Sequence, residues 1–205
     1  DAMDFKGKKG YCIGDPIDGK FFILQTTDKG NHWSMMNNTP LADSGEACFA
    51  SSGSNIAIIK KGFVFVSGGL HSHLYKYDGK VFTKDTTNFS TGRATSGANA
   101  IYVDRKKYYI VGGDFTTVKD TNNTFYYSTN NGKSFTKMNW IGYQSSITKT
   151  KHKNYIACGT NGVFYNAGDL RKWKCISPLS FHVVKKAKHG NAIYFAGSRG
   201  KIGKL

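Results

Sequence analysis

The chain has 205 residues and a formal net charge of +16, from 29 lysines and arginines against 13 acidic residues. No apolar run approaches the roughly 18 residues that a membrane-spanning helix needs, and no segment keeps a helical apolar period for long. We therefore expect no membrane span and no helix bundle. With 24 glycines, 3 prolines and 14% aromatic residues, the composition is typical of a single all-β domain with many tight turns.

Apolar segments that end in glycine recur along the chain. They occupy residues 11–14, 63–68, 108–112, 155–159 and 193–197. The glycines stand on average about 46 residues apart, which is within the range of one four-stranded propeller blade. The regular spacing predicts a repeat protein whose unit is a small β-sheet.

Each repeat is preceded by a strand-like segment that we expect to line a central channel. These leading segments are 2–5, 47–51, 100–103, 146–150 and 182–185. A further strand follows each of the first four glycines, at 21–26, 74–77, 124–128 and 162–165. The pattern predicts one β-propeller domain over residues 1–205, with antiparallel blades of about 1–40, 41–90, 91–141, 142–178 and 179–205, the last one incomplete.

Propellers commonly close when a strand from one end of the chain completes the last blade, which leaves no open edge. Here the chain begins with a leading strand and has no spare outer strand to give. We therefore expect these residues to be part of a larger ring of six or seven blades. A five-bladed ring with one open blade is the alternative.

Two turns share the pattern [S/T]-x-[D/N]-x-G-x-x-[W/F]. The first consists of Thr26, Asp28, Gly30 and Trp33, and the second of Ser128, Asn130, Gly132 and Phe135. The carboxylate or amide can accept backbone N–H groups, and the glycine takes a positive φ at no steric cost. Degenerate copies stand at 78–82 and 166–173. We interpret these residues as structural, not as ion ligands or catalytic groups.

These turns resemble the Asp boxes (BNR repeats) of sialidase-like propellers. A longer set of segments narrows the resemblance: DAMDF at 1–5, GDPIDG at 14–19, GEACFASSG at 45–53, GGDF at 112–115, GYQS at 142–145, FHV at 181–183 and AGSRGKI at 196–202. Together they resemble a bacterial family of propellers related to the photosystem II assembly factors of the Ycf48/HCF136 type. The resemblance covers essentially the whole chain.

The resemblance implies an assembly or binding protein, and it favours a periplasmic or extracellular location. Relatives of this kind are often labelled oxidoreductase or glycosyl hydrolase. Neither label is supported by the residues, because no dinucleotide-binding glycine motif and no haem or iron–sulfur cysteine spacing is present. In that family the segment at 1–5 falls well inside the protein, in agreement with the larger ring expected above.

Polar residues that begin a leading strand, or that follow the glycine of the next strand, are expected to reach one rim of the channel. They are Asp15, Glu46, Ser96, Asp114, Tyr143, Gln144 and His182. One interpretation is a pocket for a small polar ligand, a cation or a side chain of a partner. The other is that these groups cap strand ends. Both stay open, and no metal site is expected because His71 and His73 have no third ligand near them in sequence.

The principal hypothesis is a non-catalytic scaffold that binds a protein partner, without a cofactor. The alternative is a carbohydrate-active enzyme or glycan-binding module that uses a rim pocket around Glu46, the single glutamate. A glycosidase would need a second carboxylate about 5–9.5 Å from it. We lean against an enzyme, since no complete catalytic set is apparent. The oligomeric state stays open.

The charge makes a polyanion, either a glycan or a nucleic acid, a candidate partner. The lysines are spread over most of the chain and only four basic residues are arginines, so a solvated lysine-rich surface is the preferred interpretation. The four cysteines, Cys12, Cys48, Cys158 and Cys175, stand in apolar segments and are expected to be buried free thiols. A bridge between Cys158 and Cys175 is left open.

Overall fold

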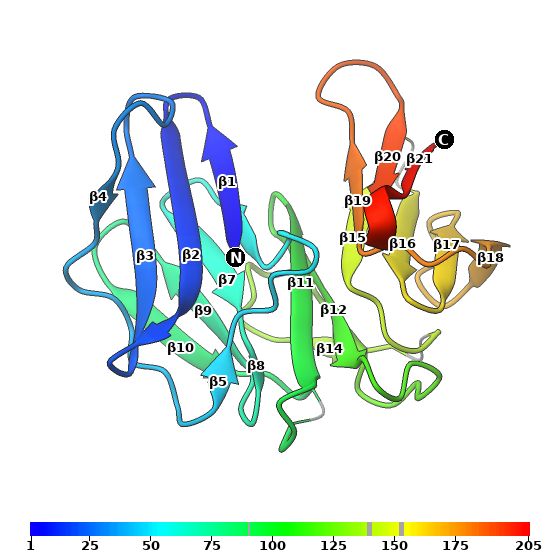
Figure 1. The fold of residues 1–205 in the computed structure, drawn as a ribbon, viewed down its shortest axis with the longest axis horizontal. Helices are drawn as coiled ribbons and strands as arrows, with labels where there is room; N and C mark the ends of the chain where they lie inside the picture. The colour runs from blue at the N-terminus through cyan, green and yellow to red at the C-terminus, as the bar shows by residue number, and fades with distance from the viewer. Residues whose placement is uncertain (90, 139–140, 152–153) are drawn as a thin grey trace.

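The computed structural model describes residues 1–89, 91–138, 141–151 and 154–205, and nearly all of its regular structure is β-strand (Figure 1). The strands form five antiparallel sheets that follow one another along the chain. This arrangement is a five-bladed β-propeller, so the predicted all-β propeller is confirmed. Within the described residues, no helix is long and apolar enough to cross a bilayer.

Each of the first four blades has four strands in chain order from the channel outward. The first blade contains β1 (Ala2–Lys6), β2 (Lys9–Ile17), β3 (Lys20–Thr26) and β4 (Ser34–Met35). The second contains β6 (Ile56–Ile58), β7 (Phe63–Val66), β9 (His73–Tyr77) and β10 (Phe82–Thr86). The third contains β11 (Ser96–Asp104), β12 (Lys107–Asp114), β13 (Phe125–Ser128) and β14 (Thr136–Lys137).

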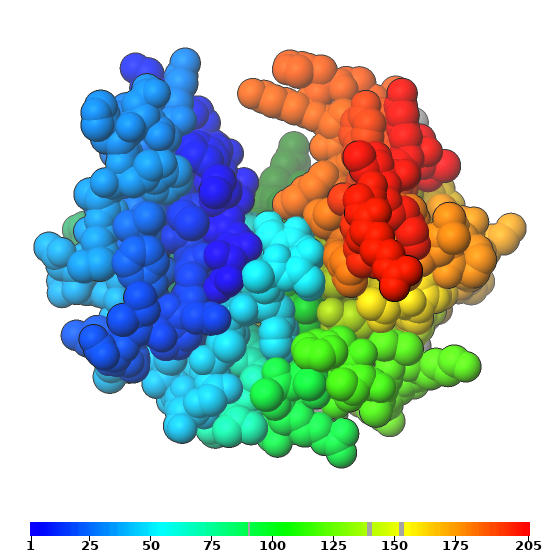
Figure 2. All heavy atoms as spheres, viewed as in Figure 1, coloured from blue at the N-terminus to red at the C-terminus, as the bar shows by residue number. Residues whose placement is uncertain are grey.

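The fourth blade contains β15 (Ser146–Lys149), β16 (Tyr155–Gly159), β17 (Gly162–Asn166) and β18 (Trp173–Ser177). The fifth contains β19 (Val183–Lys186), β20 (Ile193–Ala196) and β21 (Ile202–Lys204), with the short 3-10 turn η1 (Ser198–Gly200) before its last strand. The first strands of successive blades contact one another in chain order around the channel. Figure 2 shows the first blade, in blue, and the fifth, in red, on either side of an opening.

Hydrophobic side chains fill the spaces between consecutive blades. In the described residues they form four clusters, one for each pair of neighbouring blades. Strand β7 shows how the alternation of a strand builds two of them: Phe63 and Phe65 pack towards the first blade, whereas Val64 and Val66 pack towards the third. All four are fully buried, and each such side chain contributes about 1.5–3 kcal/mol of transfer free energy.

The two predicted turns have the same hydrogen bonds. In the first, the hydroxyl of Thr26 accepts the N–H groups of Asp28 and Gly30, at 3.3 and 3.0 Å, and donates to the Asp28 carboxylate. That carboxylate also accepts the N–H of His32 at 3.0 Å. In the second, Ser128 and Asn130 make the equivalent bonds. Both turns join the third and fourth strands of a blade.

One predicted leading strand is wrong. The strand of the second blade that faces the channel is β6 and not residues 47–51. The short strand β5 (Glu46–Ala47) instead pairs with β8 (Gly68–Gly69), which joins the third blade through Gly97. Gly69 has φ +103°, and a Cβ there would lie 2.2 Å from the carbonyl oxygen of Gly45. Glycine therefore permits an approach of two backbones that an apolar sequence pattern does not reveal.

All four cysteines are free, but only two of them are buried. Cys48 and Cys158 are 5% and 0% exposed, as expected, and burial raises the pKa of both thiols. The prediction is wrong for Cys175, which is exposed on the outer strand β18, and Cys12 is only half-buried. The outer strand of a blade has one side facing solvent, which explains the exposure of Cys175.

Candidate functional site

A pocket of about 290 Å³ lies at the mouth of the channel where four blades converge. We call it the channel-mouth pocket, and its lining residues are Cys48, Phe49, Ala50, Ser51, Asn99, Phe115, Tyr143, Thr160 and His182. Antiparallel alternation places the segments that lead into β6, β15 and β19 at the same end of the propeller as the segment that follows β12. Of the seven predicted rim residues, the structure brings Tyr143 and His182 into this pocket.

Aromatic rings form one wall of the channel-mouth pocket. Phe115 contacts Phe49 with ring centroids 5.9 Å apart at 84° and Tyr143 with centroids 6.3 Å apart at 69°, both edge to face. Phe115 is 41% exposed, whereas Tyr143 is buried. Edge-to-face packing fixes the three rings as a unit while it leaves Phe115 open to a ligand.

A buried amide provides the polar element of this pocket. Asn99 stands at a β-bulge of β11, between Ala98 and Ala100, and bulges re-aim side chains. Its Nδ2 donates to the Tyr143 hydroxyl at 3.1 Å, while its Oδ1 is buried without a hydrogen-bond donor in the described part of the chain. Such an acceptor costs about 1–3 kcal/mol, which a donor from a ligand would recover.

The ionisation of Tyr143 limits what the pocket can do chemically. Burial raises the pKa of its hydroxyl to about 12, so the side chain is neutral near pH 7. None of the described residues that line the pocket is acidic. Asp15 lies next to it at a bulge of β2, and its carboxylate accepts the N–H of Cys48 at 2.8 Å. Apolar contact and hydrogen bonds are therefore the interactions that Phe115, Asn99 and Tyr143 can offer a ligand.

Glu46 lies outside the channel-mouth pocket in a separate buried network. Its side chain is 0% exposed and accepts four groups: the N–H of Asp43 at 2.8 Å, the hydroxyl of Tyr75 at 2.9 Å, Nδ1 of His73 at 3.0 Å and the hydroxyl of Ser67. Burial by itself would raise the pKa of Glu46. The hydrogen bonds outweigh it and lower that pKa below its ordinary value.

The same network contains the described cluster that comes nearest to a metal site. Ligand atoms of Asp43, Glu46 and His73 lie within 4.8 Å of one another. However, the ammonium of Lys84 stands 2.6 Å from Asp43 and 4.0 Å from Glu46, and it supplies the positive charge there. Both oxygens of Glu46 are also hydrogen-bonded. These contacts describe a closed structural network, which we call the Glu46 network.

Sequence reasoning missed this network. The sequence places no third ligand near His71 and His73, but His73 is 6% exposed and both of its ring nitrogens face carboxylates. Its partners stand 27 and 30 positions earlier, and the pairing of β5 with β8 brings them close. The alternation His71-Ser72-His73 was the available signal. It showed two imidazoles on one side of a strand but nothing of what lies opposite.

The remaining rim residues hold loops in place. Ser96 donates to the carbonyl of Arg93 at 3.0 Å, and Gln144 donates to Asn161 at 2.8 Å. Asp114 accepts the N–H of Thr116 at 2.8 Å, and its carboxylate lies 3.5 Å from the Arg93 guanidinium. Partial burial would raise the pKa of Asp114, but these bonds lower it. The seven predicted residues share one end of the propeller but not one pocket.

Comparisons with known proteins place the fold. No family model matches the sequence, and no curated protein matches it. The solved structure of YCF48 bound to D1 peptide is similar, with a TM-score of 0.62 and 13% identity over 98% of this chain and 61% of that one. The chain thus spans 61% of the length of this neighbour. YCF48 from Cyanidioschyzon merolae gives a TM-score of 0.52 and 13% identity over 99% of this chain and 70% of that one.

A GH74 xyloglucanase from Xanthomonas campestris is similar as well, with a TM-score of 0.53 and 10% identity over 100% of this chain and 38% of that one. At these identities the likeness shows the propeller fold alone. Two of these neighbours are YCF48 proteins and the third is a glycosidase. Similarity of fold therefore does not distinguish a binding function from a catalytic one.

Proposed function

We propose that the protein is a non-catalytic β-propeller of the Ycf48-like, Asp-box type that binds a segment of a protein partner in the channel-mouth pocket. The observation that carries the proposal is the pairing of an aromatic wall with a buried, unpartnered acceptor, Asn99 Oδ1. A peptide offers both complements: an apolar side chain for Phe49 and Phe115, and a backbone N–H for the acceptor. The similar structure of YCF48, which holds a bound D1 peptide, supports a partner of this kind.

The size of the pocket favours the same conclusion. Its volume of about 290 Å³ is at the small end of ligand pockets, which range over about 300–1,000 Å³. A site of this size takes a side chain and a short stretch of backbone. It is small for several sugar rings. Partner recognition through one anchored side chain is therefore the function that the geometry supports best.

The alternative, a glycan-active site around Glu46, has less support. The Glu46 side chain is 0% exposed, so a sugar could not contact it without rearrangement of the surrounding strands. Both of its oxygens already accept hydrogen bonds, and the nearest carboxylate, Asp43, is held by Lys84. A general acid or a nucleophile needs access to the substrate, which this carboxylate does not have.

Selection from a phage-displayed random peptide library tests the proposal. We expect the intact chain to enrich peptides with a shared apolar anchor, and Phe115→Ala to weaken their affinity at least tenfold, because truncation removes the exposed ring of the wall. Val81→Ala is the matched control, since Val81 is 60% exposed and lies outside the pocket. Selected peptides that bind wild type and Phe115→Ala equally well would refute the proposal, and so would the absence of any enriched motif.

A further inference from the structure

Basic residues gather at the end of the propeller opposite the channel-mouth pocket. In every blade the first hairpin, which joins the channel-facing strand to the next strand, turns at this end because the strands alternate in direction. Figure 1 shows two of these hairpins, β1–β2 and β19–β20, both at the top of the view on either side of the opening. Exposed basic residues occupy the described hairpins: Lys6, Lys8 and Lys9 in the first blade, Lys60 and Lys61 in the second, Arg105, Lys106 and Lys107 in the third, and Lys186 and Lys188 in the fifth.

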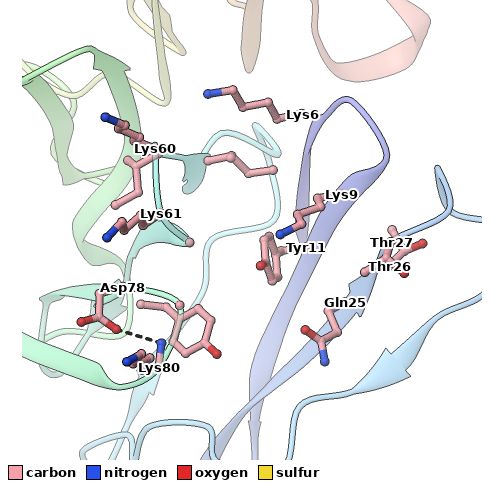
Figure 3. A pocket seen from close by; sticks show the side chains of 15 residues that line it. Lys6, Lys9, Tyr11, Gln25, Thr26, Thr27, Lys60, Lys61, Asp78 and Lys80 are labelled. Atoms are coloured by element: carbon pink, nitrogen blue, oxygen red, sulfur yellow. Dashed lines mark hydrogen bonds between the residues drawn. The ribbon is translucent and has the colours of Figure 1, made fainter.

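The first two hairpins enclose a groove of about 800 Å³, which we call the lysine groove. Figure 3 shows Lys6 and Lys9 on the first blade and Lys60 and Lys61 on the second, with the ends of Lys60 and Lys61 directed away from the first blade in this view and Lys80 below them. All five lysines are exposed. Among the described residues, none of the five lies within 4.0 Å of a carboxylate. The groove therefore holds five ammonium groups without an ion pair.

Among the described residues that line the groove, Asp78 is the one carboxylate, and its oxygen already accepts hydrogen bonds. Asp78 accepts the N–H groups of Lys80 and Val81 at 2.8 and 3.0 Å, as a turn aspartate does, and these bonds lower its pKa. It stabilises its own turn and does not pair with the lysine side chains. Like charges held on facing hairpins repel one another, and a bound polyanion would relieve that repulsion.

The floor of the groove limits which polyanion fits. Tyr11 and Tyr77 line it, but each ring packs on a neighbour: Tyr11 on Phe63 with centroids 4.4 Å apart, and Tyr77 on Phe82 with centroids 4.7 Å apart. These ring contacts cover part of each tyrosine and so reduce the aromatic surface for the base stacking that single-stranded nucleic acids use. Gln25 and Thr27 add polar groups that suit hydroxyls, whereas the hydroxyl of Thr26 is already used within its turn.

A second groove of similar character lies further round the same end. It measures about 700 Å³, lies between the third and fourth blades, and is lined by Arg105, Lys106, Lys107 and Lys149. There Lys149 pairs with Asp104 at 2.6 Å, so its charge is partly neutralised. The lysine groove has no such pair among the described residues and is the stronger of the two sites.

We propose that the lysine groove binds a linear anionic glycan through its sulfate or phosphate groups. Lysine ammonium groups are compact point charges that recognise tetrahedral oxyanions without the bidentate geometry of arginine. The polar floor accommodates the sugar hydroxyls, and the volume admits a short oligosaccharide. This site is independent of the proposed peptide site, from which it is separated by the length of the blades.

Fluorescence anisotropy with a labelled, sulfated heparin hexasaccharide tests the proposal. Binding is expected to weaken steeply with salt. Lys60→Ala/Lys61→Ala is expected to weaken it at least tenfold and to reduce the slope of log Kd against log salt by about two, one unit for each lost contact. Lys20→Ala/Lys119→Ala is the matched control, because it removes the same charge from exposed positions at the opposite end. A phosphorylated glycan and a neutral hexasaccharide separate anion recognition from sugar recognition.

Two results would overturn the proposal. Equal weakening by the two double variants would mean that only net charge matters. Tighter binding of an oligothymidylate or of phosphatidylserine vesicles than of the hexasaccharide, at equal anion concentration, would assign the groove to another partner. The Phe115→Ala variant is expected to bind the hexasaccharide as tightly as wild type. Failure of the peptide site and failure of the lysine groove are therefore distinguishable.

Discussion

The Glu46 network offers a quantitative test of whether its carboxylate is structural. Glu46→Ala leaves four donors without their acceptor: the partly buried N–H of Asp43 and the buried groups of Ser67, His73 and Tyr75. Removal of one partner from a buried charged pair typically costs about 3–5 kcal/mol. For a chain of this length each kcal/mol lowers Tm by about 2–4 °C, so we expect a decrease of roughly 6–20 °C.

Urea unfolding followed by tryptophan fluorescence measures the effect, with the m-value as a check that unfolding stays two-state. Asp85→Ala is the control, because Asp85 is an exposed carboxylate on β10 and its loss should change stability by less than about 0.5 kcal/mol. A loss below about 1 kcal/mol for Glu46→Ala would refute the reasoning, since it would mean that the four donors find other partners.

The pH dependence of folding stability provides an independent test of the Glu46 network. The folded-state pKa of Glu46 is lowered, so its carboxylate stabilises the fold at pH values above its unfolded pKa of about 4.3. That contribution is lost as pH falls through the lower, folded pKa. Glu46→Gln should therefore be less stable than wild type at pH 7, and the difference should shrink below about pH 4. A difference that grows with acidification would contradict the lowered pKa.

Two further predictions concern the backbone and the thiols. Gly97→Ala should cost about 2–5 kcal/mol, because φ is +127° and a Cβ would lie 2.5 Å from the Cα of Gly68, whereas Gly7→Ala, at φ +65° in open space, should cost about 1–2 kcal/mol. Equal urea midpoints for the two variants would contradict this close approach. A thiol reagent at pH 8 should label the exposed Cys175 first and Cys12 more slowly, and should leave Cys48 and Cys158 unlabelled until the chain unfolds, because burial raises the pKa of both buried thiols. Mass spectrometry of the labelled peptides reads the order, and early labelling of Cys158 would show that the blades open.

The blades were predictable because each one repeats the same local chemistry. Expected leading strands at 2–5, 100–103, 146–150 and 182–185 agree with β1, β11, β15 and β19. In each of them an apolar run is punctuated by turn residues and glycine, and this information is local. The second blade breaks the rule, since β6 has only three residues and the longer apolar run before it belongs to a loop segment.

The candidate site was less predictable because it depends on contacts between distant segments. Seven polar residues at strand ends were expected at one end of the propeller. Which of them share a pocket depends on loops of unequal length. Phe115 and Asn99 were not among them, although they form the wall and the acceptor of the pocket. A bulge that re-aims Asn99 has no signature in a single sequence.

The lysines at the hairpin end of the propeller are close in space although they are dispersed along the sequence. Along the sequence the lysines look dispersed, as a solvated surface would, because one blade separates each group from the next. Folding turns that separation into proximity, since equivalent hairpins of every blade lie at one end of the propeller. The loops at the other end differ in length between blades and carry the aromatic wall, as loops on a rigid scaffold commonly carry recognition. The end built from equivalent hairpins is where we propose that a repetitive polymer binds, and the end built from loops of unequal length is where we propose that a specific partner binds.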